Sequence, residues 1–255
     1  MPKRRRVQMG RFSEKVALVT GAASGVGRAT VLQLIKDGAQ VSGLDINREG
    51  LEALANEVGD QFHFTVCDIS DREAARNAVD ECVTHFGRLD IVANVAGVVR
   101  SHHATDVDEQ TWRLIMGVNV DGMFWITQAA IPHLLETGGN IVNVASNAGF
   151  MGQAYTVPYC AAKGAVINMT RALAMEYIKT DLRVNAIAPG GMKTAMTENW
   201  QVPEGIDFEL MQTYTGFRGM AEPDTAANAI CWMASDEAAR CTGSILSVDG
   251  GLTAA

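Results

Sequence analysis

The sequence lacks the patterns of disulfide-rich, exported and membrane-spanning proteins. Aromatic residues make up only 6% of its 255 residues, and its five cysteines are an odd number without Cys-x-x-Cys spacing. This cysteine usage predicts neither a disulfide framework nor a zinc site, and it fits reduced thiols in the cytoplasm. No run approaches the roughly 18 apolar residues of a membrane span, and no apolar core or cleavage site follows the arginine-rich start. We therefore expect a soluble cytoplasmic protein.

Positive charge is also scarce. With 21 lysines and arginines against 29 acidic residues, the net charge of −8 argues against nucleic acid or an anionic membrane as the main partner. The exception is the basic run Lys3–Arg6, which looks like a nuclear-import signal. Because terminal charge runs usually only solvate, residues 1–11 are predicted to form a disordered basic tail. The adjacent His102 and His103 have no third ligand spaced to join them, so we interpret them as loop residues and predict no metal site.

The composition and pattern of the chain are those of an α/β protein. It is 47% apolar and 20% charged, which allows a large core, and its length fits one domain over residues 12–255. Short β-branched runs alternate with longer helical patterns, which is typical of right-handed βαβ units. We predict a Rossmann-like, doubly wound fold with a seven-stranded parallel sheet and helices on both faces. The strands are expected at Val16–Thr20, Gln40–Leu44, Phe62–Val66, Ile91–Asn94, Asn140–Val144, Arg183–Ile187 and Ile245–Val248.

Helical periodicity is clearest in four stretches between these strands. Gly38, Gly59, Gly87 and Gly138 each follow a helical pattern, at a position where a left-handed C-cap is expected. Pro132 is expected to kink or end the longest stretch. The four stretches are Ala29–Asp37, Arg72–Phe86, Thr111–Leu135 and Tyr159–Tyr177.

A glycine-rich turn follows the first strand and opens a helix, with the sequence Thr20-Gly21-Ala22-Ala23-Ser24-Gly25-Val26-Gly27. The glycines permit a tight turn and let the backbone approach a pyrophosphate, while free N–H groups and the helix dipole favour the anion. An acid, Asp45, lies at the end of the second strand. In that context the turn predicts dinucleotide binding.

Asp45 also predicts which dinucleotide is bound. Its carboxylate can accept hydrogen bonds from the adenosine ribose hydroxyls, whereas a 2′-phosphate would meet like charge. Ser24 is neutral, so the turn offers no basic side chain to a phosphate. The sequence therefore predicts NAD rather than NADP, with the alternative that Arg48 swings toward a 2′-phosphate.

A serine, a tyrosine and a lysine further along the chain predict its chemistry. Tyr159 follows Ser146 by thirteen residues and precedes Lys163 by four. Helix positions i and i+4 share a face, so Lys163 can hold its ammonium near the phenol. A free phenol has a pKa of about 10, and an ammonium in a partly dry cleft lowers it toward the neutral range. Facing a nicotinamide, this set predicts hydride transfer at a carbinol carbon with tyrosine exchanging the proton.

Together these residues resemble the short-chain dehydrogenase/reductase family, from about Phe12 to Gly251. That family usually shows Asn-Asn-Ala-Gly after the fourth strand, so Val95 removes a polar side chain that is expected to brace the sheet. Ala162 stands where a serine is frequent. The matching motifs are the Thr-Gly-x-x-x-Gly-x-Gly turn, Asp68, Asn94-Val95-Ala96-Gly97, Asn119, Ser146, Tyr159-x-x-x-Lys163, Arg183-Val184-Asn185, Pro189-Gly190 and Val248-Asp249-Gly250-Gly251.

The resemblance implies four catalytic residues. Ser146 would hydrogen-bond the substrate oxygen and Tyr159 would exchange its proton. Lys163 would bind the nicotinamide ribose and lower the pKa of the tyrosine, and Asn119 would support a water in the proton relay. The resemblance also implies a homo-oligomer, commonly a tetramer, paired through the helices around Thr111–Leu135 and Tyr159–Tyr177.

The resemblance further implies a cofactor-binding set. Asp68 would contact the adenine amino group, and Asn94 with Ala96 would line the adenosine ribose. The residues at the nicotinamide end would be Pro189, Gly190, Met192 and Thr194. The remaining members of the set are Gly21, Ser24, Gly25, Val26, Gly27, Asp45, Ile46, Ile69, Gly97, Tyr159 and Lys163.

The segment Gly191–Met220 breaks the alternation of strands and helices, which predicts a functional lid. Its flexible and aromatic side chains suit an apolar ligand, and they equally suit packing within the lid or at a subunit interface. We expect a hydrophobic or alicyclic secondary alcohol, steroid-like or terpenoid, that is oxidised with NAD. The side chains are Met192, Met196, Trp200, Phe208, Met211, Tyr214, Phe217 and Met220.

Three other functions fit parts of the pattern. A reductase of 3-oxoacyl thioesters shares the motifs, but Asp45 and the acidic net charge weigh against NADPH and a basic surface for a carrier protein. A non-catalytic dinucleotide-binding sensor or scaffold would be expected to lose members of the set Ser146, Tyr159 and Lys163. A nucleic-acid-associated role would rest on Arg4–Arg6 alone.

Overall fold

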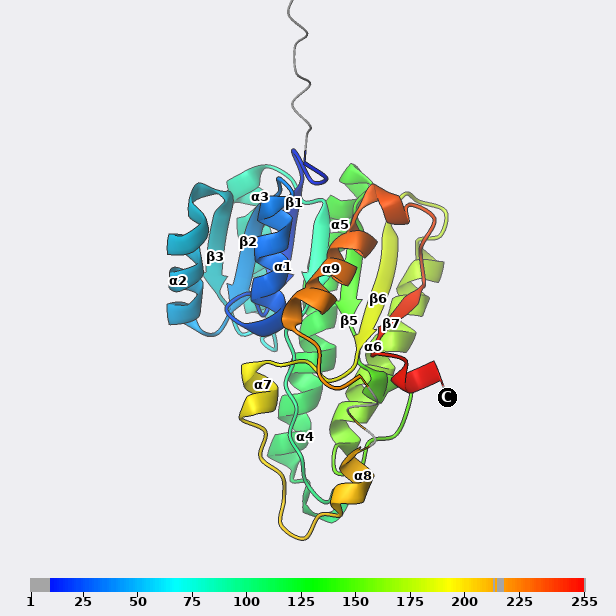
Figure 1. Ribbon diagram of the computed structural model, residues 1–255. Coiled ribbons are helices and arrows are strands. Elements are labelled where there is room, and N and C mark those ends of the chain that lie inside the picture. The colour runs from blue at the N-terminus through cyan, green and yellow to red at the C-terminus, as the bar shows by residue number, and fades with distance from the viewer. Residues whose placement is uncertain (1–9, 213, 215–217, 255) are drawn as a thin grey trace, which may run out of the picture.

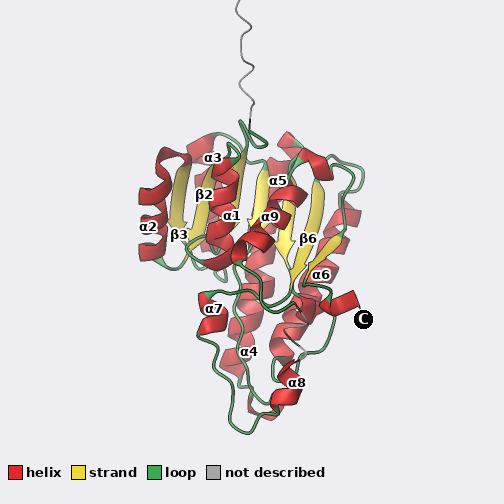
Figure 2. Ribbon diagram, viewed as in Figure 1, coloured by secondary structure: helices red, strands yellow, loops and turns green. Residues whose placement is uncertain are grey.

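A parallel sheet of seven strands forms the centre of the molecule (Figures 1 and 2). The computed structural model describes residues 10–212, 214 and 218–254. The strand order is β3-β2-β1-β4-β5-β6-β7, which confirms the predicted doubly wound fold. The strands are β1 (Val16–Thr20), β2 (Gln40–Asp45), β3 (Phe62–Val66), β4 (Ile91–Asn94), β5 (Asn140–Val144), β6 (Arg183–Pro189) and β7 (Ile245–Val248).

Two strands are longer than predicted. Strand β2 extends by one residue because Asp45 pairs with Val66 of β3, and β6 extends by two because Pro189 pairs with Val248 of β7. The other five have the predicted bounds. Asp45 is therefore the last residue of its strand, at the carboxyl edge of the sheet, where open α/β sheets bind ligands.

Helices cover both faces of the sheet (Figure 1). In β1, Ala17 and Val19 pack into a core with α1, α2 and α9, while Val16 and Leu18 pack into a second core with α3, α5 and α6. The helices are α1 (Gly25–Lys36), α2 (Arg48–Val58), α3 (Arg72–Phe86), α4 (Glu109–Met116), α5 (Met123–Thr137), α6 (Val157–Glu176), α7 (Ala195–Glu198), α8 (Phe208–Gln212) and α9 (Pro223–Ala234).

Three predicted helices have different bounds in the structure, in each case near a glycine or a proline. Helix α1 begins at Gly25 instead of Ala29, because glycines in its first turn permit a close approach to β1. The long central helix runs from Glu109 through a π-helical turn, η3 (Gly117–Gly122), to Thr137, so Pro132 does not end it. Helix α6 begins two residues early, at Val157, with Pro158 in its first turn, where proline is well tolerated.

The predicted glycine caps are mostly found. Gly87 and Gly138 are left-handed, with φ/ψ of 78°/−2° and 60°/38°, and Gly38 also has a positive φ of 99°. Gly59 has a positive φ of 73° but a ψ of −149°, so the left-handed cap predicted there is wrong. The chain continues from Gly59 straight into a 3-10 turn.

The central helix over Glu109–Thr137 is long and apolar enough, by length and composition alone, to cross a membrane. Its Ile115, Ile126 and Leu134 are fully buried against the rest of this fold. The core helix of a soluble protein passes the same test, so the finding is weak support for a membrane span.

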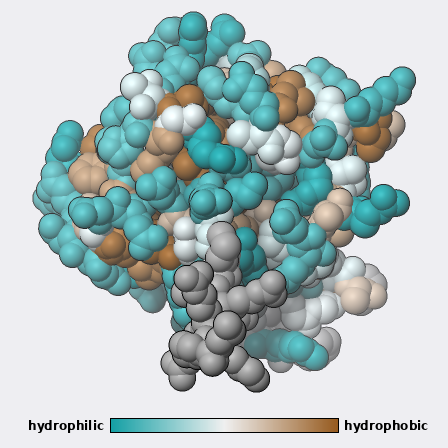
Figure 3. Space-filling view, turned by 90° about the horizontal axis from the view of Figure 1, so that it is seen from above, coloured by the Kyte–Doolittle hydropathy of each residue, from teal (hydrophilic) through white to brown (hydrophobic). Residues whose placement is uncertain are grey.

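The basic run Lys3–Arg6 lies outside the described residues. Arg11, the last residue of the predicted tail, forms ion pairs with Asp37 at 3.9 Å and Glu237 at 3.3 Å. It therefore contacts the folded domain. Figure 3 shows this end of the molecule, where hydrophilic side chains dominate and hydrophobic ones form small groups.

Candidate active site

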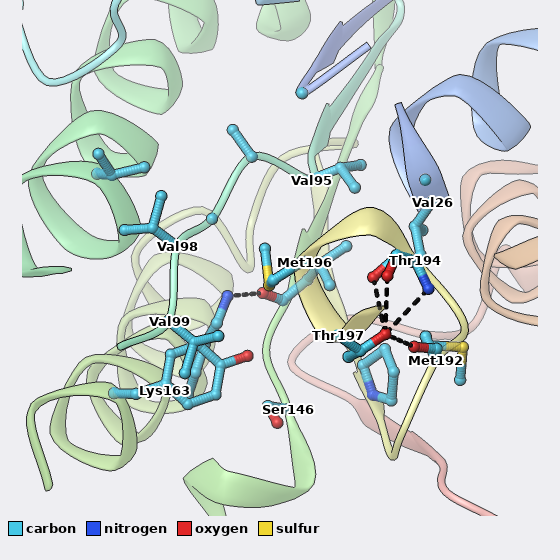
Figure 4. Close-up of a pocket in the computed structure, with 18 of the residues that line it drawn as sticks. Val26, Val95, Val98, Val99, Ser146, Lys163, Met192, Thr194, Met196 and Thr197 are labelled. Atoms are coloured by element: carbon cyan, nitrogen blue, oxygen red, sulfur yellow. Dashed lines mark hydrogen bonds between the residues drawn. The ribbon is translucent and has the colours of Figure 1, made fainter. Parts of the chain in front are cut away.

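A cavity of about 520 Å³ opens at the carboxyl edge of the sheet, where the strand order reverses between β1 and β4. In Figure 4, Val26 and Thr194 lie at one end of it, and Val99 and Lys163 lie at the other. The cavity brings together most of the predicted site residues: Gly21, Ser24, Gly25, Val26, Asp45, Ile46, Asp68, Ile69, Ala96, Gly97, Ser146, Tyr159, Lys163, Pro189, Gly190, Met192 and Thr194.

Three predicted site residues, Gly27, Asn94 and Asn119, do not line the cavity. A Cβ on Gly27 would lie 2.0 Å from the carbonyl oxygen of Gly21, so only glycine lets α1 start this close to β1. Gly27 therefore shapes the glycine-rich turn without lining the cavity itself.

Asn94 braces the sheet. It is 4% exposed, and its Nδ2 donates to Thr127 Oγ1 at 3.0 Å and to Asn143 Oδ1 at 2.9 Å. Asn143 Nδ2 in turn donates to Thr170 Oγ1 at 2.9 Å, so the chain of hydrogen bonds links β4, α5, β5 and α6. The bracing expected of an asparagine in place of Val95 is thus supplied by Asn94, and Val95 itself lines the cavity.

Asn119 ties the π-helical turn to the chain after β4. Its Nδ2 donates to the carbonyl oxygens of Ile115 at 2.8 Å and Val98 at 2.9 Å, and its Oδ1 accepts from the Val98 N–H at 3.2 Å. The side chain is 1% exposed. Both ends of the amide are occupied by the protein, so Asn119 acts here by holding the cavity wall at Val98.

The glycine-rich turn has the features that a pyrophosphate needs. Gly21 and Gly25 have positive φ values of 69° and 50°. Ser24 is the N-cap of α1 and makes no side-chain hydrogen bond to it, so donors of the first turn are left for a ligand. A Cβ on Gly25 would lie 3.2 Å from Thr194 Cγ2, so the turn and the lid form a narrow cradle.

Two carboxylates lie along the same wall. Asp45 Oδ2 accepts from the Ala23 N–H at 3.0 Å, which fixes this side chain to the turn, and Asp68 Oδ1 accepts from Ser70. Arg48 pairs with Glu52 at 3.6 Å and does not line the cavity. The charge facing a ligand at this end is therefore negative.

Ser146, Tyr159 and Lys163 meet at the other end. Ser146 follows β5, and its hydroxyl accepts from the Ala148 N–H at 3.1 Å and donates to Asn147 Oδ1 at 3.0 Å. Lys163 is 4% exposed, donates to the Val144 carbonyl at 2.7 Å (Figure 4), and lies 5.7 Å from the centre of the Tyr159 ring. Helix α6 supplies both side chains, one turn apart, as predicted.

Burial is the main influence on the pKa values of Tyr159 and Lys163. It raises the pKa of Tyr159, against a hydrogen bond with Ser146 that lowers it, and it lowers the pKa of Lys163 to about 8. The expected lowering of the tyrosine pKa by Lys163 is not found, because the ammonium is engaged by Val144 and desolvation is the larger effect. The protein alone therefore favours a neutral phenol, which is a proton donor.

The segment between β6 and α9 crosses the cavity. Its ends are joined by hydrogen bonds from Lys193 N to Ala221 O and from Ala221 N to Gly191 O, both at 2.9 Å. Trp200 donates to Ser101 Oγ and stacks on Tyr214, with 6.1 Å between ring centres. Four of the eight side chains predicted to face a ligand line the cavity: Met192, Met196, Trp200 and Tyr214. Met211 and Met220 do not line it, and Phe208 is 68% exposed. Phe217 lies outside the described residues.

Sequence reasoning missed several lining residues. Asn147 directly follows Ser146 and could have been found from that position. Gln153, Val98 and Val99 come from loops whose path only the tertiary structure shows. The expected loop at His102 and His103 is confirmed, and His103 Nε2 lies 2.8 Å from the Glu204 carbonyl oxygen.

Known proteins share this fold and sequence. A family model described as short chain dehydrogenase matches residues 15–205. The chain is 36% identical over 247 residues to a 3-oxoacyl-(acyl-carrier-protein) reductase of Thermotoga maritima, covering 95% of this chain and 99% of that protein. It is 36% identical over 245 residues to meso-2,3-butanediol dehydrogenase of Serratia marcescens, covering 96% of each. A structure of 3-ketoacyl-(acyl-carrier-protein) reductase from Brucella melitensis complexed with NADH matches with a TM-score of 0.88 and 32% identity, covering 95% and 99% of the two chains.

Proposed function

Because the chain belongs to the short-chain dehydrogenase family, we propose that it uses NAD to interconvert a secondary alcohol and a ketone. The observation that carries the proposal is one cavity with a dinucleotide cradle at one end and Ser146, Tyr159 and Lys163 at the other. The reaction converts an alcohol and NAD to a ketone, NADH and a proton.

Asp45 supports NAD over NADP. Its carboxylate is fixed at the cavity wall by the Ala23 N–H, where it can accept from ribose hydroxyls and repels a 2′-phosphate. Arg48, the cation considered above for a 2′-phosphate, is paired with Glu52. The Brucella melitensis relative, which is complexed with NADH, is consistent with this choice.

Three side chains carry the chemistry. NAD, when bound, accepts the hydride from the carbinol carbon in oxidation and returns it in reduction. Ser146 orients the reacting oxygen. In reduction the neutral Tyr159 gives its proton to that oxygen; in oxidation the phenol first releases its proton to solvent, and its phenolate then takes the proton of the alcohol. Lys163 holds a charge beside the phenol and, from its place on α6, can donate to the nicotinamide ribose. Asn119 positions the Val98 segment of the wall.

The substrate end favours a hydrophobic or alicyclic alcohol, steroid-like or terpenoid. Its apolar walls include Val98, Val99 and Met196, with the stacked pair Trp200 and Tyr214. We propose that the segment 191–220, as far as the structure describes it, acts as a lid over this end.

A second candidate is reduction of a 3-oxoacyl thioester. The similarity to the Thermotoga maritima reductase favours it. The net charge of −8 opposes it, since a carrier protein is acidic. Asp45 opposes only a reductase that depends on NADPH, because the Brucella melitensis reductase is complexed with NADH. The two candidates therefore differ in the substrate.

We also propose a homo-oligomer in the cytoplasm. Helices α4, α5 and α6 leave large apolar side chains exposed, among them Trp112 at 43%, Leu135 at 40% and Val157 at 51%. Light scattering on the purified protein measures the oligomeric state, and a monomer at micromolar concentration would contradict the assembly.

The proposed function is tested by following NADH absorbance with a panel of alicyclic, steroid, terpenoid and 3-hydroxyacyl substrates, each with NAD and with NADP. We expect turnover with NAD on an apolar alcohol. Tyr159→Phe should lower kcat by roughly 10²–10⁴-fold and leave NAD affinity nearly unchanged, because the phenol serves the proton transfer. Retained activity in the variant would remove Tyr159 from this role, and turnover of 3-hydroxyacyl thioesters alone, with either cofactor, would select the second candidate.

A further inference from the structure

Three neighbouring polar side chains at the substrate end of the cavity come from one segment. Ser146, Asn147 and Gln153 lie between β5 and α6, and all three line the cavity with Tyr159. Arg100, which follows Val99 and donates to its carbonyl oxygen, is a further polar residue of the lining. The other residues at this end are mostly apolar: Val98, Val99, Leu114, Met196, Trp200 and Tyr214.

Asn147 has more hydrogen-bonding capacity than the protein uses. It is 3% exposed, and its Oδ1 accepts both from Ser146 Oγ at 3.0 Å and from Gln153 Nε2 at 3.2 Å. Its Nδ2 has no hydrogen-bond partner among the described residues. Since a buried amide donor is nearly always paired in native proteins, an orphan in a cavity wall indicates that a ligand supplies the acceptor.

The position of this orphan relative to Ser146 limits what the acceptor can be. Asn147 is the next residue after Ser146, and the two side-chain oxygens lie 3.0 Å apart. A group that binds the amide of Asn147 while the reacting oxygen binds Ser146 is therefore expected close to the reacting carbon, and a carbon adjacent to it fits this spacing. Gln153, held by the same Asn147 oxygen, adds a second amide beside it.

Resting on the function proposed above, we propose that the carboxamides of Asn147 and Gln153 bind a second hydroxyl of the substrate. The substrate is then a vicinal diol on an apolar, alicyclic body, and the product is an α-hydroxy ketone. The second hydroxyl accepts from Asn147 and donates to Gln153. It is not oxidised: the hydride leaves the neighbouring carbinol carbon for NAD, and the proton of that carbinol hydroxyl goes to the phenolate of Tyr159, whose own proton has been released to solvent.

The proposal is tested with cyclohexane-1,2-diol and cyclohexanol, which differ only in the second hydroxyl. We measure kcat/KM for both with NAD and expect the wild type to prefer the diol by roughly tenfold or more, since a site built for a hydroxyl disfavours the analogue without it. Gln153→Met should reduce this preference to within about twofold. The matched control Gln110→Met, on an exposed position of α4, should leave the preference unchanged.

A wild-type enzyme that turns over both alcohols equally well would overturn the proposal, and so would a Gln153→Met variant that keeps the diol preference. Binding separates this failure from failure of the proposed function. In Tyr159→Phe with NAD bound, both alcohols are titrated while tryptophan fluorescence is followed, because Trp200 lines the cavity. Preferential binding of the diol without turnover in the wild type would contradict the proposed reaction alone; equal binding would contradict the second-hydroxyl site.

Discussion

The two ends of the cavity are built from different material. The dinucleotide end depends on close backbone contacts: a Cβ on Gly21 would lie 3.0 Å from Ala96 Cα, and one on Gly27 would lie 2.0 Å from the Gly21 carbonyl oxygen. The substrate end is made of side chains from separate loops, with Trp200 joined to Ser101 and stacked on Tyr214. We therefore expect substitutions to be costly where backbone atoms touch at the first end and better tolerated among the side chains of the second.

The largest effect is expected from adding a side-chain atom at Gly27, where the start of α1 contacts the glycine-rich turn. Gly27→Ala places a Cβ 2.0 Å from the Gly21 carbonyl oxygen, so the backbone of the turn must move. We expect NAD affinity, measured by calorimetric titration, to fall by roughly 100-fold or more, because strain of a few kcal/mol falls on the phosphate cradle. Gly164→Ala, whose Cβ would meet its nearest atom at 3.8 Å, is the matched control and should bind NAD normally. If Gly27→Ala bound NAD normally, the dinucleotide end would tolerate substitution as well as the substrate end does, and the contrast between the two ends would be wrong.

The next effect concerns charge at the dinucleotide end. Asp45→Ala should lower the preference for NAD over NADP by roughly 10–100-fold, because it removes hydrogen bonds to the ribose and repulsion of a 2′-phosphate. The ratio of kcat/KM for the two cofactors measures it. Glu52→Ala, which frees Arg48 from its ion pair, serves as the carboxylate control and should keep the preference for NAD. A larger change in Glu52→Ala than in Asp45→Ala would assign the discrimination to Arg48.

A smaller effect is expected at Asn94, whose hydrogen bonds join β4 to α5 and β5 and which does not line the cavity. Asn94→Leu removes the donor to Thr127 and Asn143 and should lower the free energy of unfolding by about 1–3 kcal/mol, as measured in urea. NAD affinity should change little, because Asn94 does not line the cavity. Reduced affinity with unchanged stability would instead give Asn94 a direct contact with the ribose.

The last effect is a pH-dependent gain in stability at the substrate end. Burial lowers the pKa of Lys163 from 10.5 to about 8, so between these values the unfolded chain binds more protons and stability rises with pH. Below about 8 the folded protein bears the full cost of the buried charge. Lys163→Met removes that cost and loses the hydrogen bond to Val144, so the Tm of the variant relative to wild type should be highest near ~pH 7 and fall toward ~pH 10. A Tm difference that is independent of pH would show that Lys163 is not buried as a charge.

The dinucleotide end was the more predictable of the two because its constraints are local in sequence. The turn from Gly21 to Gly27 and the acid at Asp45 each follow a strand that hydrophobic runs identify. The start of α1 was placed too late, since glycine usually weakens a helix but is required where Gly27 meets Gly21. Pro132 does not end its helix, which continues to Thr137 with Leu134 buried beyond the proline; whether it kinks the helix stays a prediction.

At the substrate end the contacts join segments far apart in the chain. Trp200 meets Ser101, and Tyr214 donates to the carbonyl of Ala154. No periodicity predicts such pairs, so the sequence indicated an apolar lid but not which of its side chains face the cavity. Gln153 was missed for the same reason, whereas Asn147 was one residue from a predicted position.

Transfer of deuterium is the most direct test of the central claim, that this cavity moves a hydride between an alcohol and NAD. The protein is incubated with NAD and an alicyclic alcohol carrying deuterium on the carbinol carbon, and the reduced cofactor is analysed by mass spectrometry. The account predicts NADH that carries the deuterium, and its loss in Tyr159→Phe. Reduced cofactor without deuterium would contradict direct hydride transfer, and deuterium transfer undiminished in the variant would contradict the role of Tyr159.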